Sequence, residues 1–225
     1  MLETFFQMHD YLVAHSEMPI RRLLMDEINW EDRLIAIKGG RGVGKTDFLL
    51  TRAREIEALH QEEMAAGTRK RKANRRPCLY VNLNNFYFTE HSLVEFASQF
   101  VKAGGKYLFL DQTFKYPGWS KELRRCHDRF HDLHIVFSAS PVMRLIEENR
   151  DLSGIVKMYN LRGFSFREYL NLQTGLHFKP YTLEEIVRAH GSISREICEL
   201  VHPLNYFKAY LKSGYFPSYR ENKDY

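Results

Sequence analysis

The chain has 225 residues, 44% of them hydrophobic, which is enough to bury one core and a small additional unit. Its three cysteines, Cys78, Cys126 and Cys198, are scattered and include no C-x-x-C pair. This pattern excludes a disulfide framework and a cysteine zinc site, and it favours a reducing, cytoplasmic location. No apolar run approaches the roughly 18–20 residues of a membrane-spanning helix, so we expect no membrane partner. The N-terminus lacks a cationic stretch, so we expect no signal peptide.

The predicted elements alternate between helices and short apolar strands. Residues 1–30 form a helical lead-in, and apolar runs at 34–37, 78–83, 107–110, 134–137 and about 158–161 predict five strands. Helical patterns at about 47–66, 92–101 and 120–130 separate the strands. This alternation predicts an α/β fold, an αβα sandwich around a mostly parallel five-stranded sheet. The pattern is wholly helical from about residue 184, so we expect a core at 31–180 and a small helical lid at 181–225.

The most specific motif is GGRGVGKT at residues 39–46, a full match to G-x-x-x-x-G-K-[ST]. It follows a predicted strand and precedes a helix, the context in which such a loop binds phosphate through backbone N–H groups and the positive helix end. The Lys45 ammonium would reach the β- and γ-phosphates, and the Thr46 hydroxyl would ligate Mg²⁺. The alternative is a glycine-rich turn with no ligand. The residues expected to bind the triphosphate here are Gly39, Arg41, Gly42, Val43, Gly44, Lys45, Thr46 and Asp47.

A carboxylate is needed opposite this loop to hold the Mg²⁺ ion. Asp111 fits, because four apolar residues precede it and place it at the end of a strand; the alternative is an Asp that only ends the strand in a turn. Hydrolysing proteins of this architecture usually place Glu next, but the chain has Gln112, whose carboxamide cannot accept a proton from water at neutral pH. We therefore expect ATP binding with slow or absent hydrolysis, whether Gln112 is natural or a trapping substitution.

Four further residues are candidates for sensing the γ-phosphate or for stabilising its charge. Ser138, and less directly Ser140, end the fourth predicted strand and would either sense the γ-phosphate or cap the helix that starts at Pro141. Arg144 and Arg162 would stabilise developing charge, in cis or across a subunit boundary of a homo-oligomer, or they are solvated. The candidate catalytic residues are therefore Gln112, Ser138 and Arg162.

Five segments together resemble a group of prokaryotic AAA+-like ATPases, known as ATP-binding proteins with an AAA domain. The segments are GGRGVGKT, PCLYVNLNNFYFTEHSL, GGKYLFLDQTFKYPGWSKEL, IVFSASP and LRGFSFREYL, and the resemblance runs from about residue 21 to 219. It implies an αβα ATPase core with ATP and Mg²⁺ as cofactors and a small helical lid, whose motif YLKSGYFP would place Pro217 near the adenine. It also implies a further C-terminal domain of unknown role, which would lie beyond the end of this sequence.

The chain departs from the pattern of this group at three places. It has Gln112 where the group has Glu, Ser-Ala-Ser-Pro at 138–141 where the group has Thr-Gly-Ser-Ser, and Ile155 after Ser-Gly where an Arg is frequent. All three departures fall on the catalytic side of the site. They favour binding without efficient turnover.

Two other features of the sequence suggest functions less strongly than the phosphate loop does. The run 69–76 carries six positive charges and would make the protein an ATP-dependent nucleic-acid-binding switch, or it is a solvated loop. His127 and His131 share a helix face, but no third metal ligand accompanies them. A phosphotransferase that moves the γ-phosphate to a small acceptor is a further hypothesis, although no acceptor site is evident.

Overall fold

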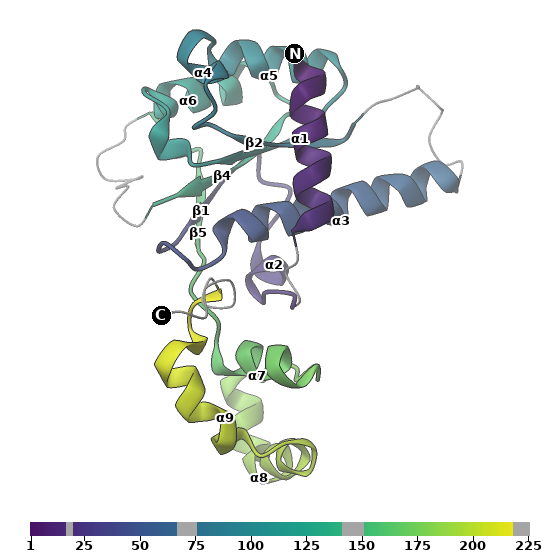
Figure 1. The fold of residues 1–225 in the computed structure, drawn as a ribbon, viewed down its shortest axis with the longest axis vertical. Helices are drawn as coiled ribbons and strands as arrows, with labels where there is room; N and C mark the ends of the chain where they lie inside the picture. The colour runs from purple at the N-terminus through teal and green to yellow at the C-terminus, as the bar shows by residue number, and fades with distance from the viewer. Residues whose placement is uncertain (17–19, 67–75, 141–150, 218–225) are drawn as a thin grey trace. The chain divides into compact units, whose positions relative to one another are not determined.

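The computed structural model describes residues 1–16, 20–66, 76–140 and 151–217 (Figure 1). The chain divides into two compact units. The first comprises Met1–Met18, Leu23–Arg41 and Lys45–Leu161, and the second comprises Pro19–Arg22, Gly42–Gly44 and Arg162–Tyr225. Each unit is described by itself.

The first unit is built on a sheet of five parallel strands. They are β1 (Leu34–Lys38), β2 (Cys78–Asn82), β3 (Tyr107–Asp111), β4 (His134–Ala139) and β5 (Lys157–Asn160), in the order β2-β3-β4-β1-β5. Parallel neighbours require crossover connections, and helices supply them along most of the chain. The predicted α/β fold with a parallel five-stranded sheet is therefore confirmed.

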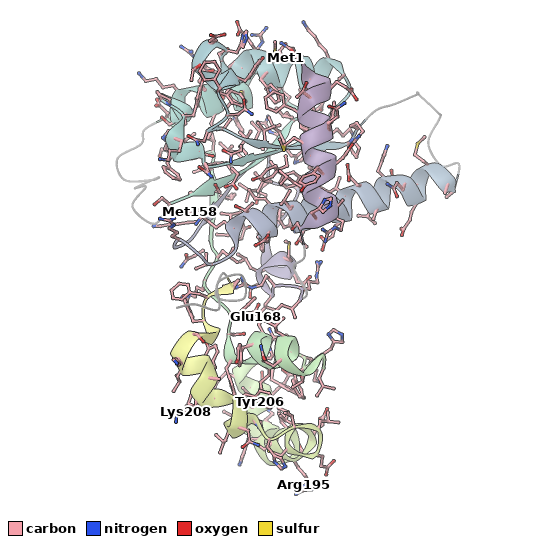
Figure 2. All side chains as sticks on the ribbon, viewed as in Figure 1. Met1, Met158, Glu168, Arg195, Tyr206 and Lys208 are labelled. Carbon is pink, nitrogen blue, oxygen red and sulfur yellow. The ribbon has the colours of Figure 1, made fainter. Side chains whose placement is uncertain are left out.

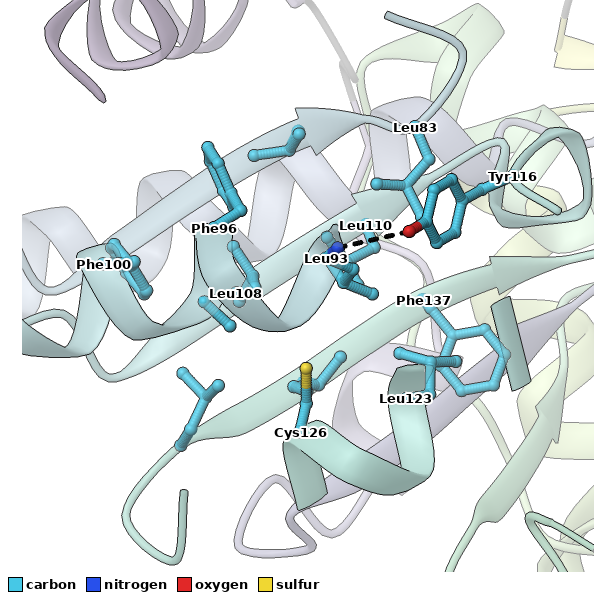
Figure 3. Close-up of a cluster of buried hydrophobic side chains, with 14 of the residues drawn as sticks. Leu83, Leu93, Phe96, Phe100, Leu108, Leu110, Tyr116, Leu123, Cys126 and Phe137 are labelled. Atoms are coloured by element: carbon cyan, nitrogen blue, oxygen red, sulfur yellow. Dashed lines mark hydrogen bonds between the residues drawn. The ribbon is translucent and has the colours of Figure 1, made fainter. Parts of the chain in front are cut away.

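Helices cover both faces of this sheet. On one face lies α3 (Lys45–Ala65), and α1 (Leu2–His15) contacts both α3 and the edge strand β2. On the other lie α5 (Leu93–Lys102) and α6 (Trp119–Arg129), whose apolar side chains pack with alternate strand residues in the main core (Figure 3). Shorter elements are α2 (Leu24–Glu27), α4 (Tyr87–Glu90) and the 3₁₀ turn η1 (Thr113–Lys115). The strands β1 to β4 are nearly wholly buried, which explains their continuous apolar sequences, whereas β5 is half-buried to exposed.

The part of the second unit that the structure describes contains four helical elements. They are α7 (Phe166–Thr174), α8 (Leu183–Leu200), α9 (Pro203–Ala209) and the π-helical segment η2 (Tyr210–Gly214). Capping boxes begin α7 at Ser165 and α8 at Thr182. The segment before α7 packs closely on the end of η2, since the Phe164 N–H donates to the Tyr215 carbonyl at 2.8 Å and a Cβ at Gly163 would lie 2.2 Å from that same oxygen. Position 163 therefore requires glycine.

Across the parts of the chain that the structure describes, no helix is both long enough and apolar enough to cross a membrane.

Candidate nucleotide-binding site

The predicted phosphate loop connects β1 to α3, as its sequence context indicates. Gly42 and Gly44 have φ values of 82° and 86°, in the left-handed region that glycine enters without steric cost. The Gly39 N–H donates to the Ala139 carbonyl at 3.3 Å, which ties the start of the loop to the end of β4. The loop leads directly into the first turn of α3, so its amides and the positive end of a 21-residue helix share one region.

The Lys45 side chain is held by hydrogen bonds to the phosphate loop itself. Its Nζ donates to the carbonyl oxygens of Gly39 at 2.8 Å and Gly40 at 2.7 Å. Burial lowers the pKa of the Lys45 ammonium below its ordinary value, and the nearby charge of Asp111 partly opposes this change. The Lys45 ammonium therefore lies within the curve of the phosphate loop. A bound anion would add negative charge there and favour the protonated form of Lys45 more strongly than Asp111 does alone.

Asp111 ends β3 and is 4% exposed, yet its carboxylate is fully hydrogen-bonded. Its Oδ2 accepts from the Thr46 hydroxyl at 2.6 Å and from the Tyr80 hydroxyl at 2.8 Å. Its Oδ1 accepts from the Ser138 hydroxyl at 2.5 Å and from the Gln112 N–H at 2.8 Å. A carboxylate offers about four acceptor sites, so these four donors compensate the buried charge.

Thr46 remains accessible to a cation although its hydroxyl proton is already used in a hydrogen bond. Its side chain is exposed, and because its hydroxyl donates to Asp111, its oxygen lone pairs point elsewhere. A hydroxyl oxygen beside a carboxylate is a hard donor set of the kind that Mg²⁺ prefers. The residues thus fit the cation that the sequence predicts.

Gln112 has a strained backbone. Its φ of 50° and ψ of 36° are left-handed, and among the described residues no other non-glycine has a positive φ. Its N–H is shared between Asp111 Oδ1 at 2.8 Å and the Ser138 hydroxyl oxygen at 3.0 Å. Strain that neighbouring groups hold in place is typical of functional positions.

Ser138 is buried, and both of its hydrogen-bonding functions face this network. Its hydroxyl donates to Asp111 and accepts from the Gln112 N–H. The structure therefore gives Ser138 a contact that sequence analysis did not foresee, the support of Asp111, and contact with a γ-phosphate stays a prediction. The helix that Ser138 was expected to cap, and Arg144 within it, lie outside the described residues.

The remaining predicted site residues are distributed over both units of the chain. Arg162 is exposed, and its backbone carbonyl accepts a hydrogen bond from Arg22. Arg41 is also exposed, Asp47 is half-buried in the first turn of α3, and Pro217 lies in the second unit just after η2. Their roles toward a nucleotide stay predictions.

Tyr80 and Arg22 belong to the surroundings of the loop and were missed as functional residues. The sequence places Tyr80 in the core, and its ring is indeed buried, but its hydroxyl contacts Asp111. The sequence did contain a signal for this contact, namely a hydroxyl-bearing residue two positions before the end of β2. Arg22 has no such signal, because its partners lie as far as 146 residues away along the chain.

His9, Glu57 and Cys78 lie close enough to suggest a metal site, but their hydrogen bonds do not fit one. His9 Nδ1 accepts the Tyr80 N–H at 2.9 Å, so the ring proton is on Nε2, which faces Glu57 Oε1 at 3.0 Å. Nε2 then has no lone pair for a metal. Burial raises the pKa of the Cys78 thiol, which donates to the Ala53 carbonyl. His9 thus joins α1 to α3 and β2, and Cys78 joins β2 to α3.

His127 and His131 are also unsuited to a metal. Arg33 Nη2 lies 2.8 Å from His127 Nε2, and Arg33 Nη1 donates to the backbone carbonyls of both histidines. A permanent cation on the candidate ligand atom repels a metal ion.

Of the basic run 69–76, the structure describes Arg76. Its guanidinium pairs with Asp10 and with Glu57 and lies over the Phe6 ring, and Asp10 raises its pKa. This arginine therefore secures α1 to the core. The rest of the run lies outside the described residues.

A glycine-rich loop between the first strand and a helix of a parallel sheet, facing an acid at the end of β3, defines a P-loop nucleotide-binding fold. The model of the AAA domain family matches residues 31–170, which is more than half of the chain. The chain therefore belongs to the AAA domain family and is an ATP-binding P-loop module, as the resemblance implies. No curated protein sequence matches it.

Several solved structures have some similarity to this chain. C. elegans PCH-2 is 16% identical over 81% of this chain and 47% of that chain, with a TM-score of 0.43. The ORC1 protein of Aeropyrum pernix, solved in complex with DNA, is 14% identical over 87% and 55%, with a TM-score of 0.41. AMPPCP-bound DnaA from Aquifex aeolicus is 11% identical over 97% and 64%, with a TM-score of 0.37. The chain thus spans about half the length of the first two.

Proposed function

We propose that this AAA module binds Mg-ATP and hydrolyses it slowly. The observation that carries the proposal is the 2.6 Å hydrogen bond between Thr46 and Asp111 beside the loop that holds Lys45. Thr46 would ligate the cation through its free lone pairs, and Asp111 would orient it and neutralise part of its charge. A bound Mg²⁺ would supply charge stabilisation at the β- and γ-phosphates.

Slow hydrolysis follows from Gln112. Its backbone is fixed by two hydrogen bonds from its own N–H, so the side chain starts from a defined point next to Asp111. A carboxamide at that point can hold a water molecule but cannot take its proton. Loss of a general base typically lowers the rate by about 10²–10⁴.

The proposed lid comprises residues 181–225, and its arrangement would follow nucleotide state, alone or in a homo-oligomer. The cysteines support a reducing, cytoplasmic location. Cys78 and Cys126 are buried free thiols, and burial raises the pKa of Cys126 to about 12, which makes it unreactive. No observation on the described residues favours the nucleic-acid-binding alternative at 69–76.

Calorimetric titration with ATP and ADP, with and without Mg²⁺, tests the binding. We expect Lys45→Ala to abolish ATP binding and Asp111→Asn to remove its dependence on Mg²⁺. Phosphate release tests the turnover, and Gln112→Glu should raise it by about 10²-fold or more. Gln61→Glu makes the same chemical change at an exposed position of α3 and is the matched control. Turnover by the unaltered chain equal to that of Gln112→Glu would disprove the slow-hydrolysis part.

A further inference from the structure

Arg22 is a buried arginine, 4% exposed, that contacts three separate parts of the second unit. Its Nε donates to Glu168 Oε1 at 3.1 Å, and its Nη1 donates to the carbonyl oxygen of Val43, in the phosphate loop, at 3.2 Å. Its Nη2 donates to the carbonyl oxygens of Arg162 at 2.6 Å and Gly163 at 3.0 Å. The planar fork of donors thus holds the loop and the segment leading into α7 at the same time.

Glu168 continues this chain of contacts into α7. Its Oε2 accepts from the Ser165 N–H at 2.8 Å, and the Glu168 N–H donates to the Ser165 hydroxyl oxygen at 3.2 Å, which together form the capping box of α7, while Oε1 faces Arg22. Glu168 is 5% exposed and stands in the first turn of α7 (Figure 2). One carboxylate therefore both starts the helix and neutralises the buried guanidinium.

The contact with Val43 has a consequence for the phosphate-binding amides. The Val43–Gly44 peptide is trans, so its carbonyl and its N–H point in opposite directions. Because Arg22 holds the Val43 carbonyl, the Gly44 N–H points away from Arg22. Arg22 thus fixes the orientation of an amide that the loop needs for phosphate.

We propose that Arg22 is a positioning residue for the phosphate loop and that Arg22 and Glu168 form a clasp, which couples nucleotide occupancy to the start of α7. The proposal rests on the proposed function, ATP binding at this loop. A phosphate that accepts from the Gly44 N–H polarises the peptide and strengthens its carbonyl as an acceptor for Arg22. Tighter binding of Arg22 in turn favours the arrangement of Glu168 that caps α7. Coupling of this kind is reciprocal, so weakening either end of the clasp must weaken the response at the other.

Two variants of the full chain separate this coupling from a merely structural ion pair. Arg22→Lys keeps the positive charge beside Glu168 but lacks the fork that reaches Val43 as well. Glu168→Gln removes the charge but keeps an oxygen that can complete the capping box, in which Gln replaces Glu. The matched controls are Arg188→Lys and Glu184→Gln, in an exposed ion pair on α8 of the same unit.

The experiment measures ATP affinity by calorimetry and amide hydrogen exchange of residues 166–174 with and without Mg-ATP. In the unaltered chain we expect ATP to slow this exchange about fivefold or more. Arg22→Lys should weaken ATP binding about tenfold or more and abolish the slowing. Glu168→Gln should abolish the slowing with a smaller loss of affinity, and the controls should behave as the unaltered chain.

The outcomes distinguish the clasp from the proposed function. If both variants bind ATP normally and ATP still slows exchange in α7, the clasp is disproved and ATP binding stands. If the unaltered chain binds no ATP, the proposed function is disproved and the clasp with it. Should Arg22→Lys fail to fold, Glu168→Gln decides the matter, because it keeps the helix cap: retained slowing overturns the clasp, and lost slowing with retained ATP binding supports it.

Discussion

Replacing Tyr80 by Phe removes one of the four hydrogen-bond donors to the buried carboxylate of Asp111 and leaves the ring in place. The Tyr80 hydroxyl lies 2.8 Å from Asp111 Oδ2, and both residues are 4% exposed. Burial and the charge of Asp111 raise the pKa of this phenol, so it stays a donor over the whole range in which proteins are stable. The substitution therefore takes away a charge-assisted hydrogen bond and little else.

The expected size of the effect follows from the charge and burial of the acceptor. A hydrogen bond to a charged group contributes about 1.5–3 kcal/mol, and water has little access to replace this one. We expect Tyr80→Phe to lower the free energy of unfolding by that amount. Tyr11→Phe, at a position that is 59% exposed, should change it by less than about 0.5 kcal/mol.

Urea unfolding at pH 7, followed by circular dichroism, measures this change as a lower midpoint at an unchanged slope. A double-mutant cycle with Asp111→Asn isolates the pair, since the loss on removing the Tyr80 hydroxyl should shrink by about 1 kcal/mol or more once the carboxylate is neutral. An equal loss in both backgrounds would show that the hydroxyl acts through something other than the charge of Asp111. A loss below about 0.5 kcal/mol in the unaltered background would show that the Tyr80 hydroxyl makes no charge-assisted contribution to stability.

Two further predictions concern Lys45 and the cap of α5. Burial lowers the pKa of Lys45 from 10.5, so between its folded pKa and 10.5 the unfolded chain holds more protons and the contribution of Lys45 to stability rises with pH. ATP binding needs the ammonium, so ATP affinity should fall as pH rises through that window. Calorimetry over a pH series up to 10.5, in buffers of different ionisation enthalpy, should show proton uptake on ATP binding that grows with pH, and uptake that stays flat would contradict this role of Lys45. Ser92→Ala removes the hydroxyl that accepts from the Glu95 N–H at 3.2 Å and should lower the free energy of unfolding by about 1 kcal/mol, whereas Ser92→Gly should cost only a few tenths; equal losses in urea unfolding would contradict the capping role.

The elements that sequence analysis located are those whose signal is local. The strands at 34–38, 78–82, 107–111 and 134–139 and the helices between them agree with the predictions to within about two residues, because apolar runs and helical spacing are properties of neighbouring residues. The phosphate loop was found for the same reason. By contrast, α4 and α7 were not predicted, since α4 has four residues and α7 follows a segment whose partners are distant.

The order of the strands and the contacts of Asp111 could not be obtained in this way. In the sheet, β4 pairs with both β1 and β3, so Ser138 lies between the strand that precedes the loop and the strand that ends in Asp111. The pairing of β4 with β1 joins residues about a hundred positions apart, Ser138 and Asp111 are themselves 27 positions apart, and one sequence contains no local pattern for either contact. The Ser138–Asp111 hydrogen bond depends on that order, which is why sequence analysis offered Ser138 only as a phosphate sensor or a cap.

At residue 112, the terminal group of the side chain decides the expected turnover, because Gln and Glu would share the same backbone conformation. A left-handed backbone at a non-glycine residue is energetically unfavourable by about 1 kcal/mol or more, and here Asp111 and Ser138 hold it in place through the residue's own N–H. Neither hydrogen bond involves the side chain, so a glutamate at 112 would occupy the same backbone conformation beside the same Asp111. The two versions then differ in one terminal group, an amide or a carboxylate, with the apparatus that positions it unchanged. A gain in turnover on Gln112→Glu would therefore measure the missing base itself, because no rearrangement of the site is needed to accommodate it.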